Sequence, residues 1–503
     1  MRAAGTVLAA WLGPATWLAV PTLLVAQGAA GLWPGLLIVV APLLALTLRA
    51  RLPADDTTRA SIPLVHVATY FLMVALLIWA GLVLAGDLGS RLGAPRWHGI
   101  ALAAAGGLLL TAWRGAERAV PVLLLVAGVS ALMPLIALSA STGLSPLAAW
   151  RAVSERPAFV FPATSRWVTE GRDLRLAQGL QPLRFEEAHR ITAAVETTLR
   201  TRIREGRQTL DREAPLATGQ SFTLRPGDQL EPTPGTRVKF EAGRRVPGAP
   251  ATGLVWADGG AQGIVATLAS VGLGVTLLGA GVALFGPPLA DRASRGEIVL
   301  VGAILLATFW ALQAWAVYAV LAAPEIFMGG ITPDRLIDVP GLAMVARPTG
   351  VPLQLLLVVA VGASFMASTV ALRARLAAVD PAGDGEIGSD LGLWTMVFVM
   401  AALASLWHVD PWALSLTALG AGAAVFLPRA LLPNAAERPE IATVAGVTAL
   451  AVYGILLLLG RVTGLARPAE SLLGALCEQP ALLAVPAGLG ALWLATRGGR
   501  RTR

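Results

Sequence analysis

Apolar residues along this chain gather in about a dozen runs of 16 to 25 residues, and one long charged stretch at 142–262 interrupts them. An α-helix of roughly 20 apolar residues matches the hydrocarbon thickness of a bilayer. The pattern therefore predicts a polytopic membrane protein rather than a water-soluble one. The predicted spans are 6–27, 33–48, 62–86, 98–113, 119–140, 263–286, 298–322, 351–373, 391–408, 411–428, 441–460 and 480–496.

These runs divide the chain into three parts. Residues 1–141 hold transmembrane helices 1–5, residues 142–262 form an extracytoplasmic domain, and residues 263–503 hold helices 6–12 with an outer loop at 323–350. The predicted fold class is an all-α polytopic membrane protein of about 12 transmembrane helices, with one small α+β extracytoplasmic domain inserted after the fifth helix.

The first half of the domain has a pattern that indicates an amphipathic helix at 185–207. Apolar residues recur there at three- and four-residue spacing, and His189 falls on the polar, solvated face. The apolar positions are Ala188, Ile191, Val195, Leu199 and Ile203. An interfacial helix lying on the membrane is an alternative, which the interleaved glutamates oppose.

The second half of the domain indicates a small sheet or partial barrel. Short strands are predicted at 221–224, 229–231, 237–241 and 253–256, separated by turn signals rich in Pro and Gly. Such a module can bind a periplasmic or membrane protein partner, or brace the membrane helices.

Charge placement supports this organisation and sets the orientation. The stretch 142–262 holds 17 basic and 13 acidic residues, which is 30 of the 70 charged residues of the chain. The remaining arginines gather in alternate short loops, and the positive-inside rule places those loops in the cytoplasm. We therefore expect both termini inside, 142–262 outside, and residence in the bacterial inner membrane. The net charge of +8 follows from these loops and implies no nucleic-acid partner.

The cysteine content and the apolar N-terminus lead to two further expectations. Cys477 is the only cysteine, so no intramolecular disulfide can form. The apolar N-terminus is interrupted by Gly13-Pro14 and Pro21 and is followed at once by another span, so we interpret it as a retained first span rather than a cleaved leader.

Ionisable residues within spans are costly and are functional candidates for that reason. His66 lies early in the third span, and His408 with Asp410 lies at the outer end of the ninth. A His-Asp pair could relay protons or bind a cation. The plainer interpretation is that His66 reaches water at the inner boundary and that 408–411 is a hairpin turn. Ligation of a b-type haem by two histidines has no support in their spacing.

Two further polar residues occur in apolar surroundings. Glu478 is predicted at the interface, at the end of an outer amphipathic helix that Pro480 terminates. Gln313 in the seventh span is expected to hydrogen-bond to a neighbouring helix.

The outer loop at 323–350 concentrates charge together with Pro and Gly. Loops of this kind cap a cavity or partly re-enter the membrane, although a plain connector is the alternative. Its charged residues are Glu325, Asp334, Arg335, Asp338 and Arg347.

The end of this loop resembles a known family. The segment 341–353, Gly-Leu-Ala-Met-Val-Ala-Arg-Pro-Thr-Gly-Val-Pro-Leu, running into Val361-Gly362-Ala363-Ser364, is similar to the outer loop that precedes a late span in the SEDS (FtsW/RodA-type) glycan polymerases. The resemblance covers about residues 330–376. The family continues with Pro-Phe where this chain has Gln354-Leu355, and four further spans follow where the family ends.

The resemblance implies handling of a lipid-linked glycan on the outer face, and, if the chain is an enzyme, a membrane glycosyltransferase. The charge of the loop itself makes Asp334 and Asp338 the candidate catalytic residues, because an acidic pair there could hold a divalent cation against a pyrophosphate. Arg347 would contact phosphate. The remaining candidate binding residues are Arg335, Thr349, Gly350, His408 and Asp410.

Three functions stay open at this point. The leading hypothesis is a multi-pass inner-membrane protein of bacterial cell-envelope biogenesis that handles a lipid-linked glycan. The second is a secondary transporter or channel, which needs buried polar groups at mid-membrane. The third is a non-catalytic scaffold subunit that recruits a partner through 142–262.

Overall fold

The computed structural model describes most of the chain, and the structural statements below refer to this part. The described residues are 8–50, 63–113, 115–161, 171–175, 182–205, 208–231, 236–259, 264–285, 295–328, 336, 350–379, 391–407, 409–432, 438–463 and 472–501.

Helices lie on all twelve segments that the hydrophobic pattern predicts as spans. Before the domain these are a short helix at 8–11, α2 (Pro14–Gln27), α3 (Leu32–Ala50), α4 (Leu64–Arg91), α5 (Arg96–Ala112) and α6 (Val120–Thr142), with the 3-10 turns η1 (Gly28–Gly31) and η3 (Ala116–Ala119). After the domain they are α9 (Ile264–Phe285), α10 (Arg295–Ala322), α12 (Gly350–Val379), α14 (Leu391–Ala404), α15 (Pro411–Leu431), α16 (Pro439–Thr463), α17 (Leu472–Glu478) and α18 (Ala481–Arg501), with the 3-10 turn η4 (Pro324–Phe327).

Eight stretches of the described chain are long and apolar enough to cross a membrane, and a ninth is added if α17 and α18, bent by 77°, form one span. Helix α14 is apolar but shorter. These are the helices of a multi-pass membrane protein, as predicted. The full number of twelve crossings stays a prediction.

The first of those stretches, 14–38, contains a reversal of the chain. A Cβ atom on Gly31 would lie 2.3 Å from the carbonyl oxygen of Leu23. The indole of Trp11 donates to the carbonyl of Ile38 at 2.9 Å. Helices α2 and α3 are therefore an antiparallel hairpin, in agreement with the separate spans predicted at 6–27 and 33–48.

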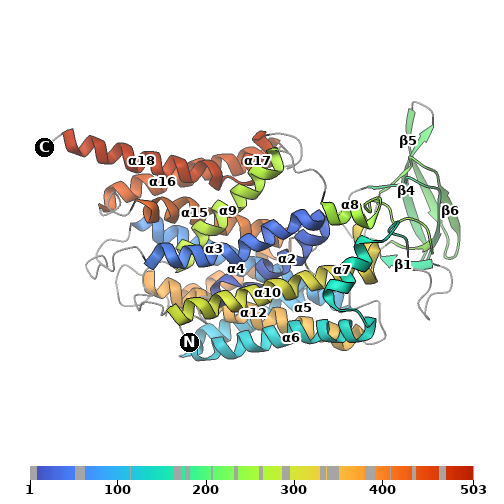
Figure 1. Ribbon diagram of the computed structural model, residues 1–503, viewed down its shortest axis with the longest axis horizontal. Coiled ribbons are helices and arrows are strands. Elements are labelled where there is room, and N and C mark those ends of the chain that lie inside the picture. Colours follow the sequence, from blue (N-terminus) through green and yellow to red (C-terminus); the bar gives the residue numbers. More distant parts are fainter. Residues whose placement is uncertain are drawn as a thin grey trace.

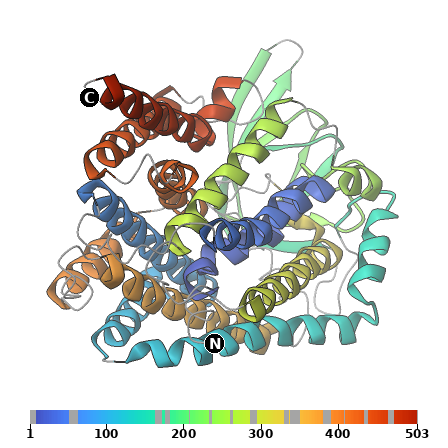
Figure 2. The same cartoon turned by 60° about the vertical axis from the view of Figure 1, so that its left-hand side comes forward.

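The helices form one bundle with the β-domain at one end (Figure 1). Helix α15 is central, because it contacts α4, α9, α16 and α18. Helices α6 and α18 lie on opposite flanks of the bundle in both views (Figures 1 and 2). The last turns of α18 lie at the end of the bundle away from the β-domain (Figure 1).

The domain contains two four-stranded antiparallel sheets with strand orders β1-β8-β3-β6 and β2-β7-β4-β5. This is the strand order of an eight-stranded jelly roll. Its strands are β1 (Gly171–Arg175), β2 (Leu183–Arg184), β3 (His189–Ala193), β4 (Thr197–Glu205), β5 (Gln208–Leu216), β6 (Ser221–Leu224), β7 (Gln229–Glu231) and β8 (Arg237–Glu241). Buried side chains from both sheets, among them Leu183, Ile191, Leu199, Leu230 and Phe240, belong to one core.

The predicted amphipathic helix at 185–207 is wrong. Strands β3 and β4 occupy this segment, and burial alternates along β3, so that His189, Ile191 and Ala193 face the core. A spacing of four residues is a multiple of the two-residue period of a strand as well as close to one helical turn. The apolar positions 191, 195, 199 and 203 therefore fit both structures, and sheet pairing decided between them.

The strands predicted at 221–224, 229–231 and 237–241 are confirmed as β6, β7 and β8. The strand predicted at 253–256 is wrong, because helix α8 (Gly253–Asp258) lies there. The hydroxyl of Thr252 caps it by accepting a hydrogen bond from the amide of Val255 at 3.2 Å.

Helix α7 (Pro146–Ser154) leads into the domain and α8 leads out of it, and both linkers pack on the bundle. The rings of Trp150 and Trp256 lie 5.1 Å apart. The indole of Trp256 donates to the carbonyl of Val25 at 3.1 Å. Gly28 has φ +57°, and a Cβ there would lie 1.7 Å from the carbonyl oxygen of Trp256, so only glycine fits. These contacts dock the domain on the α2–α3 turn.

Candidate functional site

The first span is broken at Leu12 and Gly13, between the short helix at 8–11 and α2. Pro14 begins α2, where the absence of its N–H costs nothing to the new helix. The hydroxyl of Ser364 on α12 donates to the carbonyl of Leu12 at 2.7 Å and accepts from the indole of Trp17 at 3.2 Å. One serine therefore fixes both sides of the break.

A cavity of about 20 Å³ lies at this break, which we call the break cavity; it is room for about one water molecule. The helix break, α4, α12 and α15 enclose it. Its hydroxyl lining consists of Thr16, Ser368, Thr369 and Ser415, and no carboxylate, imidazole or guanidinium of the described residues lines it.

The four hydroxyls fall into two pairs. Thr369 donates to the carbonyl of Phe365 at 2.9 Å, and Ser415 donates to the carbonyl of Pro411 at 2.9 Å. Thr16 and Ser368 are 4% and 5% exposed, and neither hydroxyl has a hydrogen bond within the described part of the chain. Unmet hydrogen-bonding capacity in an apolar bundle marks a place where a small polar ligand fits.

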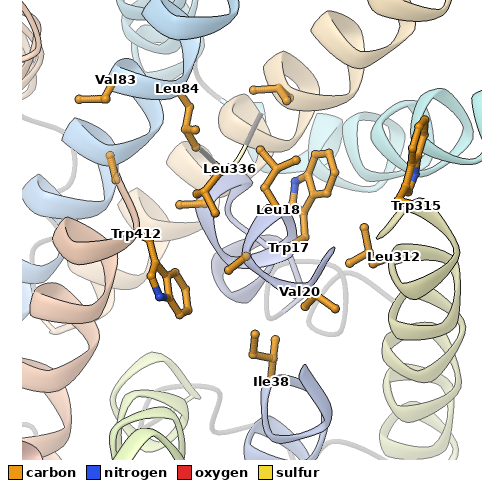
Figure 3. Close-up of a cluster of buried hydrophobic side chains, with 14 of the residues drawn as sticks. Trp17, Leu18, Val20, Ile38, Val83, Leu84, Leu312, Trp315, Leu336 and Trp412 are labelled. Carbon is orange, nitrogen blue, oxygen red and sulfur yellow. The ribbon is translucent and has the colours of Figure 1, made fainter. Parts of the chain in front are cut away.

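The outer loop supplies the second candidate site. The loop begins at η4, which is buried. The rings of Phe327 in η4 and Phe159 lie 4.9 Å apart, so the start of the loop packs against the linker of the β-domain. Leu336 is 1% exposed and belongs to the core of the bundle. Figure 3 draws its side chain together with Leu18 and Leu84. The loop therefore sends at least the side chain of Leu336 into the bundle.

Most of the residues singled out in the sequence for this loop lie outside the described residues. These are Asp334, Arg335, Asp338, Arg347 and Thr349, and His408 is outside as well. Gly350 is the first residue of α12. Asp410 caps α15 by accepting from the amide of Trp412 at 2.8 Å, which agrees with the hairpin-turn interpretation.

His66 does not reach water as expected, because it is only 1% exposed. Its ring lies edge-on to Phe426 on α15, with ring centroids 5.2 Å apart. Neither imidazole nitrogen has a hydrogen-bond partner within the described residues. The cause is the packing of α4 against α15, which covers the start of α4.

The expected interhelical hydrogen bond of Gln313 is also absent from the described part of the chain. Gln313 is 5% exposed, and neither atom of its amide has a partner there. A Cβ on Gly35 of α3 would lie 3.1 Å from its Nε2, so the amide packs against a glycine that offers no side chain. Glu478 ends α17 at the bend before Pro480, where the predicted helix ends, and its position at the membrane interface stays a prediction.

His189 is buried in the jelly roll rather than solvated, which corrects the prediction that placed it on a polar helix face. Its ring lies 5.0 Å from that of Phe185 and 6.3 Å from that of Phe240. Burial lowers the pKa of this imidazole below its ordinary value. Among the described residues, no three His, Cys, Asp or Glu side chains gather as metal ligands.

Sequence reasoning missed the break cavity, although half of the signal was visible. Gly13-Pro14 interrupts the apolar pattern of the first span. Serine and threonine within apolar spans gave no further signal, because they also satisfy themselves on the preceding helical turn, as Thr22 does with Leu18. Only the packing shows which hydroxyls meet.

Comparison with known proteins returns no relative: no family model, no curated protein and no solved structure matches this chain.

Proposed function

We propose that this protein is a multi-pass membrane protein of the bacterial cell envelope that handles a lipid-linked glycan at the outer end of the helix bundle. The observation that carries the proposal is the burial of Leu336, which anchors the outer loop in the bundle two residues from Asp334 and Asp338. A charged loop that buries Leu336 in the bundle is suited to a ligand with a polar head and an apolar tail.

The arrangement of the domain supports the same end of the bundle. The loop begins at η4, which contacts the domain linker at Phe159, and the jelly roll lies beyond that linker. A pyrophosphate-linked sugar bound at the loop would thus lie between the bundle and the domain. The resemblance of 341–364 to SEDS polymerases suggests the lipid-linked glycan as the ligand class, with Asp334 and Asp338 holding a divalent cation and Arg347 contacting phosphate.

The proposal is tested by binding. The full chain in lipid nanodiscs is offered a polyprenyl-pyrophosphate-linked disaccharide in the presence of Mg²⁺. Asp334→Ala, Asp338→Ala and Arg347→Ala should each weaken binding by about tenfold or more, because each loses a charge-assisted contact. Asp211→Ala, an exposed change on β5, is the matched control and should bind as the parent does.

Two outcomes overturn the proposal. The parent chain fails to bind the lipid-linked disaccharide, or the three loop variants bind it as tightly as the Asp211→Ala control. In the second case the loop is a connector.

A transporter is the second candidate function, and the break in the first span favours it. Substrate and ion sites of transporters are typically formed by interrupted helices. A transporter must open the break cavity to water in one of its states. In a Cys477→Ser background, Thr16→Cys should then react with a maleimide although Thr16 is 4% exposed. Complete protection of that cysteine would count against transport.

A further inference from the structure

We propose that the break cavity binds one small monovalent cation, with Na⁺ as the ion to test, through main-chain and hydroxyl oxygens. This inference goes beyond the glycan proposal and does not rest on it, because the break cavity and the outer loop share no residue that either argument uses.

The main chain supplies the first oxygen. Ala10, in the short helix at 8–11, lines the cavity, and we assign its carbonyl oxygen as a ligand. Its helical partner would be the N–H of residue 14, which is Pro14 and has none. The proline that starts α2 therefore leaves a carbonyl oxygen without its helical donor inside the bundle.

Two hydroxyls supply oxygens that can only accept. Thr369 and Ser415 have given their protons to the carbonyls of Phe365 and Pro411. A hydroxyl that has donated its proton keeps its oxygen lone pairs. Both residues line the cavity, and their remaining capacity suits a cation or a hydrogen-bond donor, not an anion.

Two further hydroxyls are uncommitted. Thr16 and Ser368 are more than nine-tenths buried, line the cavity and have no hydrogen bond within the described part of the chain. They complete a set of one carbonyl and four hydroxyl oxygens. Oxygen ligands are those that hard cations prefer, and Na⁺ is held at unwound helix carbonyls in transporters.

Size and charge select the ion. The cavity has room for about one water-sized particle. Divalent cations are usually held with the help of carboxylates that offset their charge, and among the described residues no carboxylate lines the cavity. A neutral oxygen set with room for one particle fits a monovalent cation.

The test measures Na⁺ binding to the full chain in lipid nanodiscs. Unfolding temperature is followed while NaCl replaces choline chloride at constant ionic strength, and radioactive sodium is used to count bound ions. Na⁺ should raise the unfolding temperature saturably, because a ligand that binds only the folded state stabilises it.

Two variants act on the cavity in different ways. Ser368→Ala removes one oxygen. Gly13→Ala adds a methyl group 3.4 Å from the Ser368 hydroxyl, and Gly13 has φ −58° and ψ 154°, which alanine adopts without strain. Each should weaken Na⁺ affinity by about tenfold or more. Ser405→Ala is the matched control, since Ser405 is buried and donates to Ala401 but does not line the cavity.

The proposal is overturned if no radioactive sodium binds, or if NaCl and choline chloride give the same unfolding temperatures, since the cavity would then hold water only. It is also overturned if Ser405→Ala loses as much affinity as Ser368→Ala. The loop variants Asp334→Ala and Asp338→Ala should keep the Na⁺ effect, which separates failure of this site from failure of the glycan proposal.

Discussion

Arg156, which follows α7, donates a hydrogen bond from Nη2 to the carbonyl of Leu321 at the end of α10, at 2.9 Å. Its Nη1 donates a second hydrogen bond to the carbonyl of Val320, at 3.4 Å. The last carbonyls of a helix lack intrahelical partners and carry partial negative charge, so a cation there is favourable. Burial lowers the pKa of this guanidinium, but arginine titrates so far above physiological pH that it stays charged.

Replacing Arg156 by alanine should loosen the domain from the bundle. The change removes two charge-assisted hydrogen bonds and leaves two carbonyls unmet, at a cost of about 2 kcal/mol. Proteolysis at 155–162 in the nanodisc-held chain should accelerate, whereas Arg151→Ala, an exposed change on α7, should leave it unchanged. Equal cleavage of both variants would show that the linker is held by other contacts.

Leu199 and its neighbour Thr198 test the strand assignment of β4. Leu199 is 1% exposed and Thr198 points to solvent, because successive strand residues face opposite sides. Leu199→Asp should unfold the jelly roll, since burying an unpaired carboxylate costs several kcal/mol. Thr198→Asp should leave it folded, as judged by protease resistance of 183–241 in the full chain. If the two variants were equally resistant to protease, the alternation along β4 would be wrong.

His189 should make the jelly roll sensitive to acid. Burial holds its folded pKa below the ordinary 6.5, so the unfolded chain binds more protons between the two values. Stability is therefore unaffected by this group above about pH 6.5 and falls as the pH drops below it. His189→Leu should flatten that fall between pH 7 and about pH 5, measured as protease resistance of the domain. An unchanged pH profile in the variant would assign the acid sensitivity to other groups.

Cysteine labelling tests the orientation inferred from the arginine loops. Cys477 is buried and can be replaced by serine, which leaves a chain without thiols. Lys239→Cys on β8 and Arg497→Cys near the end of α18 lie at exposed positions at opposite ends of the bundle. In intact cells an impermeant maleimide should label the first and not the second. Labelling of both, or of Arg497→Cys alone, would contradict the topology.

The sequence predicted the helix bundle closely because bilayer thickness imposes a length on every apolar run. It predicted β6, β7 and β8 for a similar reason, since Pro226-Gly227 and Gly243 mark turns that interrupt any helix. These signals are local and do not depend on what packs against them.

The segment 185–207 failed because its apolar spacing of four residues satisfies two periods at once. The strand period is hidden at Thr201, which lies between two of those positions. This residue is polar, yet it is only 2% exposed because it lies inward on β4. Burial of His189, Gln313 and His66 likewise depends on partners far away in the chain. The break cavity depends on contacts between Gly13 and Ser368, and no sequence pattern joins them.

The contact between the Trp256 indole and Val25 spans 231 residues, so the surface on which the domain rests is synthesised long before the domain itself. In the topology predicted from the arginine loops, the N-terminal hairpin enters the bilayer first during translation, and its Gly28 turn lies on the outer face. In that topology the jelly roll is then translocated, folds and docks on that turn while the later spans are still being made. We therefore expect assembly in two stages, and a substitution at Gly28 should leave the membrane part inserted and the domain undocked.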